Sequence, residues 1–197
     1  MLLLLAIGAG LIVGVGWSRL QNRPYQIPPL RFMWLALIAF LPQLIIAYLP
    51  ITHNIIDDRL ASSAILTSLI LFLIFVWKNR FIPGMPILLV GLVLNLAVMA
   101  FNGGWMPVSP QTASQLIGKN VLQFMSLGSR FGQKDILLLS QNTNLEILAD
   151  RFLLPSWFPY HAAFSLGDVL IGLGIFWLLV NPSNNNYRIS APERITS

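Results

Sequence analysis

Apolar residues along the chain are gathered into five runs that are separated by polar segments. Each run has at least 16 residues, and a helix that crosses a bilayer needs roughly 17 to 25. The pattern predicts an all-α integral membrane protein with about five transmembrane helices. We expect residues 1–180 to form a single transmembrane domain and the polar residues 181–197 to form a disordered tail. The expected spans are residues 2–17, 33–51, 61–77, 85–101 and 164–180.

The composition agrees with a membrane protein. Of the 197 residues, 56% are hydrophobic and 10% are charged, whereas soluble domains carry roughly 25% charged residues. The net charge is +5, but the basic residues are spread between the apolar runs. We therefore expect no nucleic-acid partner. The chain contains no cysteine, which excludes disulfides, thiolate metal sites and cysteine nucleophiles.

The distribution of basic residues predicts the orientation, because cytoplasmic loops are enriched in Lys and Arg. Three basic residues follow the first run, two follow the third, and two lie in the tail. We therefore expect a multi-pass protein of the cell membrane with its N-terminus outside and its C-terminus in the cytoplasm. The long loop of residues 102–163 then lies outside.

The long loop carries weaker structural signals. Asn102-Gly103-Gly104 is typical of a tight turn, and Trp105 and Trp157 near the two ends of the loop suggest an interfacial aromatic belt. Apolar residues on one helical face predict a short interfacial helix over residues 115–128. The apolar segments 136–139 and 145–148 flank a polar stretch and predict a small hairpin.

Small and polar residues inside the runs predict helix contacts. Ala6, Gly10 and Gly14 recur every four residues and should form a face on which another helix packs closely. Gln43 follows Pro42 in the second run, where it can help to satisfy the backbone that the proline leaves open. Asn95 lies within the fourth run and is expected to make an interhelical hydrogen bond.

Asp168 is the one acidic residue inside an apolar run, and such residues are candidates for function. The spacing Ser165-x-x-Asp168 before an apolar run is also that of a helix capping box. In that interpretation Ser165 caps the last helix and Asp168 has a structural role. Alternatively, Asp168 pairs with Asp150, which lies upstream in the loop, and the two carboxyl groups share a proton and activate a water molecule.

The second alternative is supported by a resemblance. Phe164-Ser165-Leu166-Gly167-Asp168, with Asp150 upstream in Ala149-Asp150-Arg151-Phe152, resembles the catalytic region of lipoprotein signal peptidase (signal peptidase II). The resemblance implies an aspartic-type membrane hydrolase with Asp150 and Asp168 as catalytic residues. Ser165 stands where that family has Asn, Gly167 stands where it has Ala, and the family's upstream Asn-x-x-Asp-Arg motif is absent.

A longer part of the chain resembles a bacterial family of multi-spanning membrane proteins of unknown function. The residues that carry this resemblance are the glycine-rich first run, Asn102-Gly103-Gly104-Trp105-Met106-Pro107-Val108, and the segment from Phe164 to Ile171. The resemblance implies a shared fold and no particular activity.

Three functional classes remain open on the sequence. The favoured one is a non-catalytic polytopic membrane protein that acts as an accessory or structural subunit, with lipid and other membrane subunits as its partners. The alternatives are the aspartic membrane peptidase and a small transporter component. The sequence has no metal-ligand spacing and predicts no cofactor, and a haem or pigment contact near His53 or His161 is an open alternative.

Overall fold

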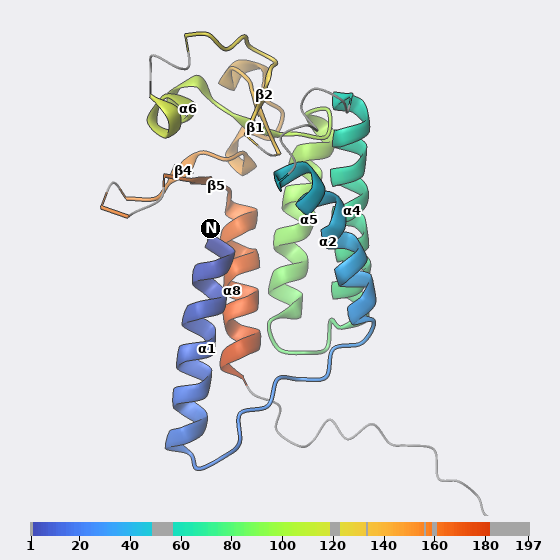
Figure 1. The fold of residues 1–197 in the computed structure, drawn as a ribbon, viewed down its shortest axis with the longest axis vertical. Coiled ribbons are helices and arrows are strands. Elements are labelled where there is room, and N and C mark those ends of the chain that lie inside the picture. The colour runs from blue at the N-terminus through green and yellow to red at the C-terminus, as the bar shows by residue number, and fades with distance from the viewer. Residues whose placement is uncertain are drawn as a thin grey trace, which may run out of the picture.

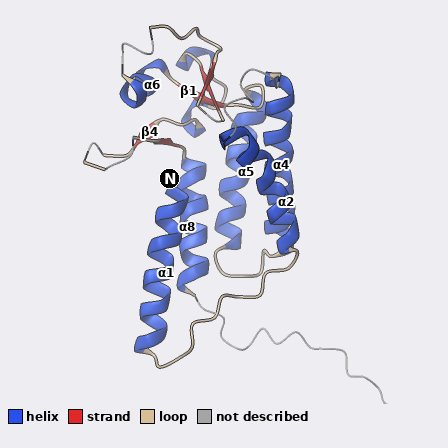
Figure 2. Cartoon of the chain, in the orientation of Figure 1, coloured by secondary structure: helices blue, strands red, loops and turns tan. Residues whose placement is uncertain are grey.

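The computed structural model describes residues 2–48, 57–118, 123–132, 134–155, 157–158 and 161–181. His53 and nearly all of the expected disordered tail therefore lie outside the described residues. The described part is mostly helical (Figures 1 and 2). Its α-helices are α1 (Leu2–Leu20), α2 (Met33–Tyr48), α4 (Asp58–Lys78), α5 (Met85–Phe101), α6 (Pro110–Ile117) and α8 (Leu166–Val180).

The five long helices form a chain of pairwise contacts, which we call the row; α1, α8, α5 and α4 stand side by side, and α2 crosses in front of α4 (Figure 1). Helix α1 packs on α8, α8 packs on α5, α5 packs on α4, and α4 packs on α2 (Figure 1). The two terminal helices of the row, α1 and α2, each have one extensive helix partner. Each of the five apolar runs thus forms a helix, and the last run enters the row between α1 and α5.

Small residues set the spacing between α1 and α8. The position of a Cβ atom on Gly10 would lie 3.0 Å from Leu179 Cβ, and one on Gly14 would overlap the Leu179 carbonyl oxygen. Ala6 continues this face, because its Cβ lies 3.6 Å from the position that a Gly172 Cβ would take. The Ala6-Gly10-Gly14 face therefore packs on a helix of the same chain.

Glycines also allow α5 and α8 to approach. A Cβ on Gly91 would lie 2.8 Å from the backbone nitrogen of Ile171, and one on Gly174 would lie 2.7 Å from that of Leu88. Both distances are too short for a real side chain. Substitution of either glycine would force the two backbones apart.

Polar side chains join α2 to α4 near the proline in α2. Gln43 Nε2 donates a hydrogen bond to Ser68 Oγ at 2.8 Å, and Ser68 Oγ donates in turn to the Ala39 carbonyl oxygen. Gln43, Ser68 and the backbone of α2 thus form one polar contact between the two helices, three residues before Pro42. The carbonyl oxygen that Pro42 leaves open is that of Ile38, so the expected role of Gln43 in satisfying it stays a prediction.

At one end of the helix axes, where α1 ends and α8 ends, the loops are joined by hydrogen bonds. Asn79 accepts a hydrogen bond from the Arg31 backbone N–H at 2.8 Å and donates one to the Arg31 carbonyl oxygen at 2.9 Å. Tyr25 donates to the Leu179 carbonyl oxygen at 2.8 Å. The N-terminus of α1 and the described part of residues 102–165 lie at the opposite end of the helix axes, which is the upper end in Figure 1.

Residues 102–165, which we call the β segment, contain two small sheets at this opposite end (Figure 2). In the first sheet β3 (Asp135–Leu137) is central, parallel to β1 (Met106–Val108) and antiparallel to β2 (Arg130–Phe131). In the second sheet β4 (Phe152–Leu153) pairs with β5 (Ala163–Phe164). Two 3-10 helices, η1 (Ser140–Asn142) and η2 (Glu146–Leu148), connect the sheets.

Three expectations for the loop are wrong. For the described residues the interfacial helix over 115–128 is wrong: α6 begins earlier, where Ser109 caps Thr112 N–H and Pro110 occupies the first turn, and it ends at Ile117, before Gly118, whose φ is +80°. Residues 123–128 are not helical, and residues 119–122 lie outside the described residues. The hairpin over 136–148 is not formed either, because residues 146–148 adopt a 3-10 helix and β3 pairs with β1 and β2. Trp105 is 5% exposed and lies in the core instead of an interfacial belt.

Among the described residues, α1 and α4 are long and apolar enough to cross a membrane. Helices α5 and α8 and most of α2 are apolar but shorter. Length and composition give only weak support for membrane insertion, because core helices of soluble proteins and signal sequences meet the same criteria. The number of spans thus stays a prediction.

Candidate functional site

Polar side chains from separate segments meet where the β segment contacts α5 and α8. Lys134, which precedes β3, places Nζ 3.2 Å from Asp150 Oδ2 and 3.5 Å from Asp168 Oδ2. The two carboxylates singled out in the sequence therefore lie beside one ammonium group. Lys134 itself was not expected at this site, since one lysine in a long polar loop gives no distinguishing pattern.

The position of Asp168 is fixed by the first turn of α8. Ser165 is the N-cap residue, and its Oγ accepts a hydrogen bond from Asp168 N–H at 3.0 Å. Asp168 Oδ2 accepts one from Ser165 N–H at 3.3 Å, which completes a capping box. Besides capping the helix, the carboxylate can contact groups outside it through both of its oxygens.

Asn95 of α5 connects the two capping residues to the neighbouring helix. Its Nδ2 donates a hydrogen bond to Asp168 Oδ1 at 2.8 Å, and its Oδ1 accepts one from Ser165 Oγ at 2.9 Å. A Cβ on Gly167 would overlap the Asn95 side chain. Glycine at position 167, one of the departures from the peptidase motif, is thus required by the Asn95 contact.

Asp150 is held in the β segment and is almost completely buried. Its side chain is 2% exposed, and its backbone N–H donates a hydrogen bond to the Pro107 carbonyl oxygen at 3.2 Å. Burial raises the pKa of Asp150, the ammonium group of Lys134 lowers it, and the carboxylate of Asp168 raises it again, so that the pKa lies above the ordinary value. Its Oδ1 atom has no hydrogen-bond partner among the described residues.

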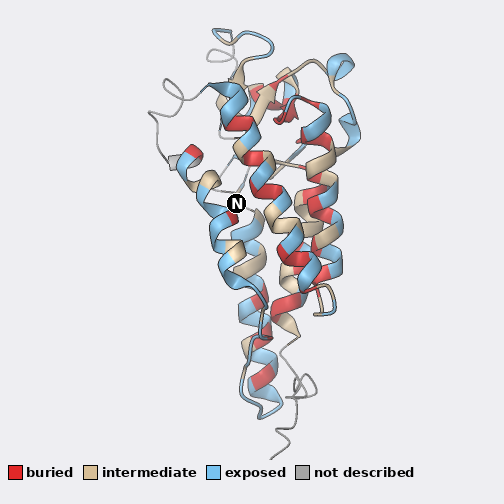
Figure 3. Cartoon of the chain, turned by 90° about the vertical axis from the view of Figure 1, so that its right-hand side faces the viewer, coloured by how far each residue is buried: buried red, intermediate tan, exposed pale blue. Residues whose placement is uncertain are grey.

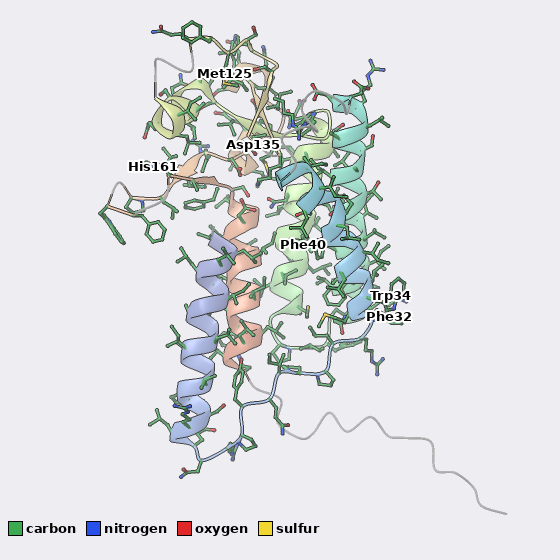
Figure 4. All side chains as sticks on the ribbon, viewed as in Figure 1. Phe32, Trp34, Phe40, Met125, Asp135 and His161 are labelled. Carbon is green, nitrogen blue, oxygen red and sulfur yellow. The ribbon has the colours of Figure 1, made fainter. Side chains whose placement is uncertain are left out.

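Burial and the neighbouring charges act on the pKa values of Lys134 and Asp135 in opposing directions. Burial lowers the pKa of Lys134, but the negative charges of Asp150, Asp168 and Asp135 raise it, and the net result is a pKa above the ordinary value for lysine. Burial and the charges of Asp150 and Asp168 raise the pKa of Asp135 to about 8, against a lowering by Lys134. At neutral pH Lys134 is therefore an ammonium ion, while Asp135 is largely protonated. Figure 4 labels Asp135 where the strands meet the helical bundle.

A second set of contacts attaches the β segment to α4. The guanidinium of Arg130 lies 4.7 Å from the ring centroid of Trp105, a distance typical of a cation–π interaction. Arg130 Nη1 lies 4.0 Å from Asp58 Oδ1 in the first turn of α4. The β segment is thus fixed to the helices at two places.

A polar cavity of about 210 Å³ lies next to Asp150. Pro107 of β1, Ser109 and Thr112 at the start of α6, and Glu146 of η2 form part of its wall, together with Asp150 and Arg151. Polar atoms make up most of the lining surface. One of the two lysine-bridged carboxylates, Asp150, therefore lines the cavity.

The remaining residues of interest lie elsewhere. Gln43 and the Ala6-Gly10-Gly14 face are in helix contacts along the row, and His161 is exposed before β5 (Figure 4). Among the described residues, no group of three or more His, Asp or Glu side chains could hold a metal ion. The charged and amide groups at the end of α5 and α8 are therefore the candidate functional site.

Residues 28–180 match a protein family described as a family of unknown function (DUF5317). This range runs from the loop before α2 to the end of α8 and includes every residue of the candidate site. The chain belongs to this family. The membership agrees with the resemblance to an uncharacterised family and assigns no activity.

A similar protein is known from Thermotoga maritima. It is described as an uncharacterized protein and is 35% identical to this chain over 117 residues, which are 58% of this chain and 61% of the relative. The matched part thus covers less than two thirds of the relative's length. No solved structure matches the chain.

Proposed function

We propose that this protein is a non-catalytic, five-span membrane protein that serves as an accessory or structural subunit of a larger membrane complex. The observation that carries the non-catalytic part is the position of Lys134 Nζ between Asp150 and Asp168. In an aspartic peptidase the two carboxyl groups share one proton and hold a water molecule. An ammonium ion beside both carboxylates favours the ionised form of each and argues against a shared proton.

The surface of the row supports membrane insertion. Exposed apolar side chains occur in the middle of all five long helices, and exposed residues recur along the helices in Figure 3. One example from each long helix is exposed by between 47% and 76%: Ile12, Leu37, Ile70, Val90 and Leu173. Large exposed apolar surfaces mark contacts with lipid or with other proteins. The described charged residues of the long helices all lie in the first or last turn.

The positions of the loops support an orientation with the N-terminus outside. The loop around Arg31 and Asn79 and the end of α8 lie at one end of the row, which the excess of Arg and Lys places in the cytoplasm. The β segment then lies outside. Because the chain has no natural cysteine, single cysteines introduced at Ser126 and Ser190 report the two sides. A membrane-impermeant maleimide should label the first from outside and the second only after permeabilisation; labelling of both from one side would contradict the orientation.

The open row supports a role as a subunit. Helices α1 and α2 have one extensive helix partner each. The outer sides of these two helices, together with the faces of the row, are therefore available for other membrane helices. A protein that worked alone in the membrane would cover these surfaces with lipid. A measurement of the protein's mass after mild extraction distinguishes a chain surrounded by lipid alone from a chain in a complex.

The mass of the protein tests the subunit role. The tagged full-length chain, expressed in its natural host, is extracted in a mild detergent and its protein mass is measured by light scattering and native mass spectrometry. We expect a stoichiometric complex with a second, identifiable membrane protein, which dissociates in harsh detergent. A single 22 kDa chain after mild extraction would contradict the proposal.

The aspartic peptidase is the second candidate, and one observation favours it: Asp150 and Asp168 do approach the same nitrogen. Two observations disfavour it: the contact between Gly167 and Asn95, and the ammonium group of Lys134 beside both carboxylates. An assay of the purified protein on a membrane-inserted peptide, with Asp168→Asn as control, distinguishes the two. Cleavage that depends on Asp168 would replace our proposal. For the transporter alternative, Gln43 and Asn95 are used in hydrogen bonds between neighbouring helices and give no support for a substrate path.

A further inference from the structure

The cavity beside Asp150 lies outside the lysine-bridged contacts of the proposed structural role. Its wall is made by segments far apart in the chain: the β1–α6 connection with Ser109 and Thr112, η2 with Glu146, and the Asp150-Arg151 pair that leads into β4. All of the residues that line it belong to the β segment, and none belongs to the five long helices.

A buried carboxylate at this cavity has an unused oxygen. Asp150 lines the cavity and its side chain is 2% exposed. Its Oδ2 faces Lys134, whereas Oδ1 has no hydrogen-bond partner among the described residues. A buried polar atom without a hydrogen bond is costly, and one on a charged group especially so. A donor placed in the cavity would remove this cost after a small adjustment of the wall.

The charge of the cluster favours a positively charged donor. Lys134 contacts two carboxylates, Asp150 and Asp168, and contributes a single positive charge. The three groups together therefore have a net charge of −1 when both acids are ionised. Glu146 adds a second carboxylate to the cavity wall itself. An ammonium group between Glu146 and Asp150 would be attracted by both.

The same wall carries one group of opposite sign. Arg151 is exposed and has no ion-pair partner among the described residues. A guanidinium binds a carboxylate through two parallel hydrogen bonds. Arg151 follows Asp150 directly in sequence and lines the same cavity, so the wall carries a cationic group as well as two acidic ones.

We propose that this cavity binds a small zwitterion, a molecule with an ammonium group and a carboxylate on the same carbon, such as a free α-amino acid. The ammonium group donates hydrogen bonds toward Asp150 and Glu146, and the carboxylate pairs with Arg151. The hydroxyl groups at the start of α6 complete a polar wall. Binding at this site is a property separate from the subunit role, and either can hold without the other.

Calorimetric titration of the full-length protein in detergent tests the proposal. Each of the twenty standard amino acids is titrated singly, and ethanolamine and glycolate serve as probes that carry only one of the two charged groups. We expect at least one amino acid to bind saturably with one site per chain, and both single-charge probes to bind at least tenfold more weakly. Absence of saturable binding by all twenty, or equal binding of ethanolamine or glycolate, would overturn the proposal.

Variants of the exposed wall show whether the binding occurs in this cavity. Arg151→Gln and Glu146→Gln each remove one charge without touching the contacts of Lys134, and each should weaken binding at least tenfold. Arg59→Gln is the matched control, because Arg59 is an exposed arginine near the same end of the row and does not line the cavity. It should leave the affinity unchanged. Affinity that survives Arg151→Gln, in a protein with an unchanged circular dichroism spectrum, would refute the site.

Discussion

Asn95 of α5 donates a hydrogen bond from Nδ2 to Asp168 Oδ1 of α8 at 2.8 Å. This contact joins two helices that are packed through glycines, and it uses a carboxylate that also accepts the backbone N–H of Ser165. Asp168 therefore has hydrogen-bond and charge partners on α5, α8 and the β segment. This set of partners explains a carboxylate in an apolar helix without any reaction.

We expect the loss of the Ser165 hydroxyl to lower the stability of the protein more than the loss of the Asp168 charge. Ser165→Ala removes the cap of α8 and the donor to Asn95 Oδ1, so we expect a loss of roughly 1–2 kcal/mol in the free energy of unfolding. Asp168→Asn should cost less, because its amide oxygen can keep the hydrogen bond from Ser165 N–H, while Asn95 with its amide group turned over can accept one from the new NH2 group. Chemical denaturation in detergent measures both.

The exposed Ser63 provides the control for this comparison. Its Oγ donates only to the Arg59 carbonyl oxygen within α4, so Ser63→Ala should change stability by less than about 0.5 kcal/mol. If Asp168→Asn were instead more damaging than Ser165→Ala, the charge of Asp168 and not the cap would be the main contribution.

Close packing of α1 on α8 predicts a position-dependent effect of large side chains. Gly10→Leu places a side chain where even a Cβ is 3.0 Å from Leu179, and we expect a destabilisation of about 1–3 kcal/mol. Gly16 lies on the same helix with no atom near its Cβ position. Gly16→Leu should therefore leave the melting temperature unchanged or raise it, since glycine is unfavourable inside a helix. Equal effects of the two variants would show that the small-residue spacing has no packing role.

The five helical segments could be predicted from sequence because each apolar run is long enough to have one interpretation. The β segment could not, since its strands have two or three residues and pair with distant segments. The parallel pairing of Met106 with Asp135 leaves no periodic signal in either segment. Local turn chemistry carried a signal that the predicted helix over 115–128 missed: Ser109 and Pro110 mark the start of α6, and Gly118 marks its end.

Four residues of the candidate site could be singled out from sequence: Ser165 by its capping-box spacing, Asn95 as a polar residue in an apolar run, and the two acids. Asp168 was noticeable because it interrupts an apolar run, and Asp150 because of its place in a resemblance. Lys134 and Asp135 lie in a polar loop whose fold is set by long-range strand pairing, so nothing in their neighbourhood indicated that they would meet the two acids. Charges that meet through tertiary structure are seen only in three dimensions.

The raised pKa of Asp135 predicts a pH dependence. The ordinary pKa of 3.8 becomes about 8 in the folded protein, because burial and the negative charges of Asp150 and Asp168 raise it by more than the positive charge of Lys134 lowers it. Between these values the folded state binds more protons than the unfolded state, so this group makes stability fall as pH rises from about 4 to about 8. Asp135→Asn should remove this part of the slope.

Melting curves of the wild type and Asp135→Asn from pH 5 to pH 8.5 measure the effect. The wild type should lose more stability toward high pH than the variant, and the two curves should diverge over this range. Parallel curves would mean that Asp135 is ionised in the folded protein throughout. The raised pKa of Asp150 acts in the same direction in both proteins, so the comparison isolates Asp135.

The stability of Lys134→Met tests the central claim most directly, namely that Lys134 holds Asp150 and Asp168 as structural, ionised groups. Removing one partner of a buried charge contact leaves uncompensated charges, and the 37% exposure of the Lys134 side chain reduces the cost to roughly 1–3 kcal/mol. Our account predicts this loss at pH 7, and a large recovery when Asp150→Asn and Asp168→Asn are added to Lys134→Met. A Lys134→Met protein as stable as the wild type would contradict it, because two carboxyl groups that share a proton have no need of the lysine.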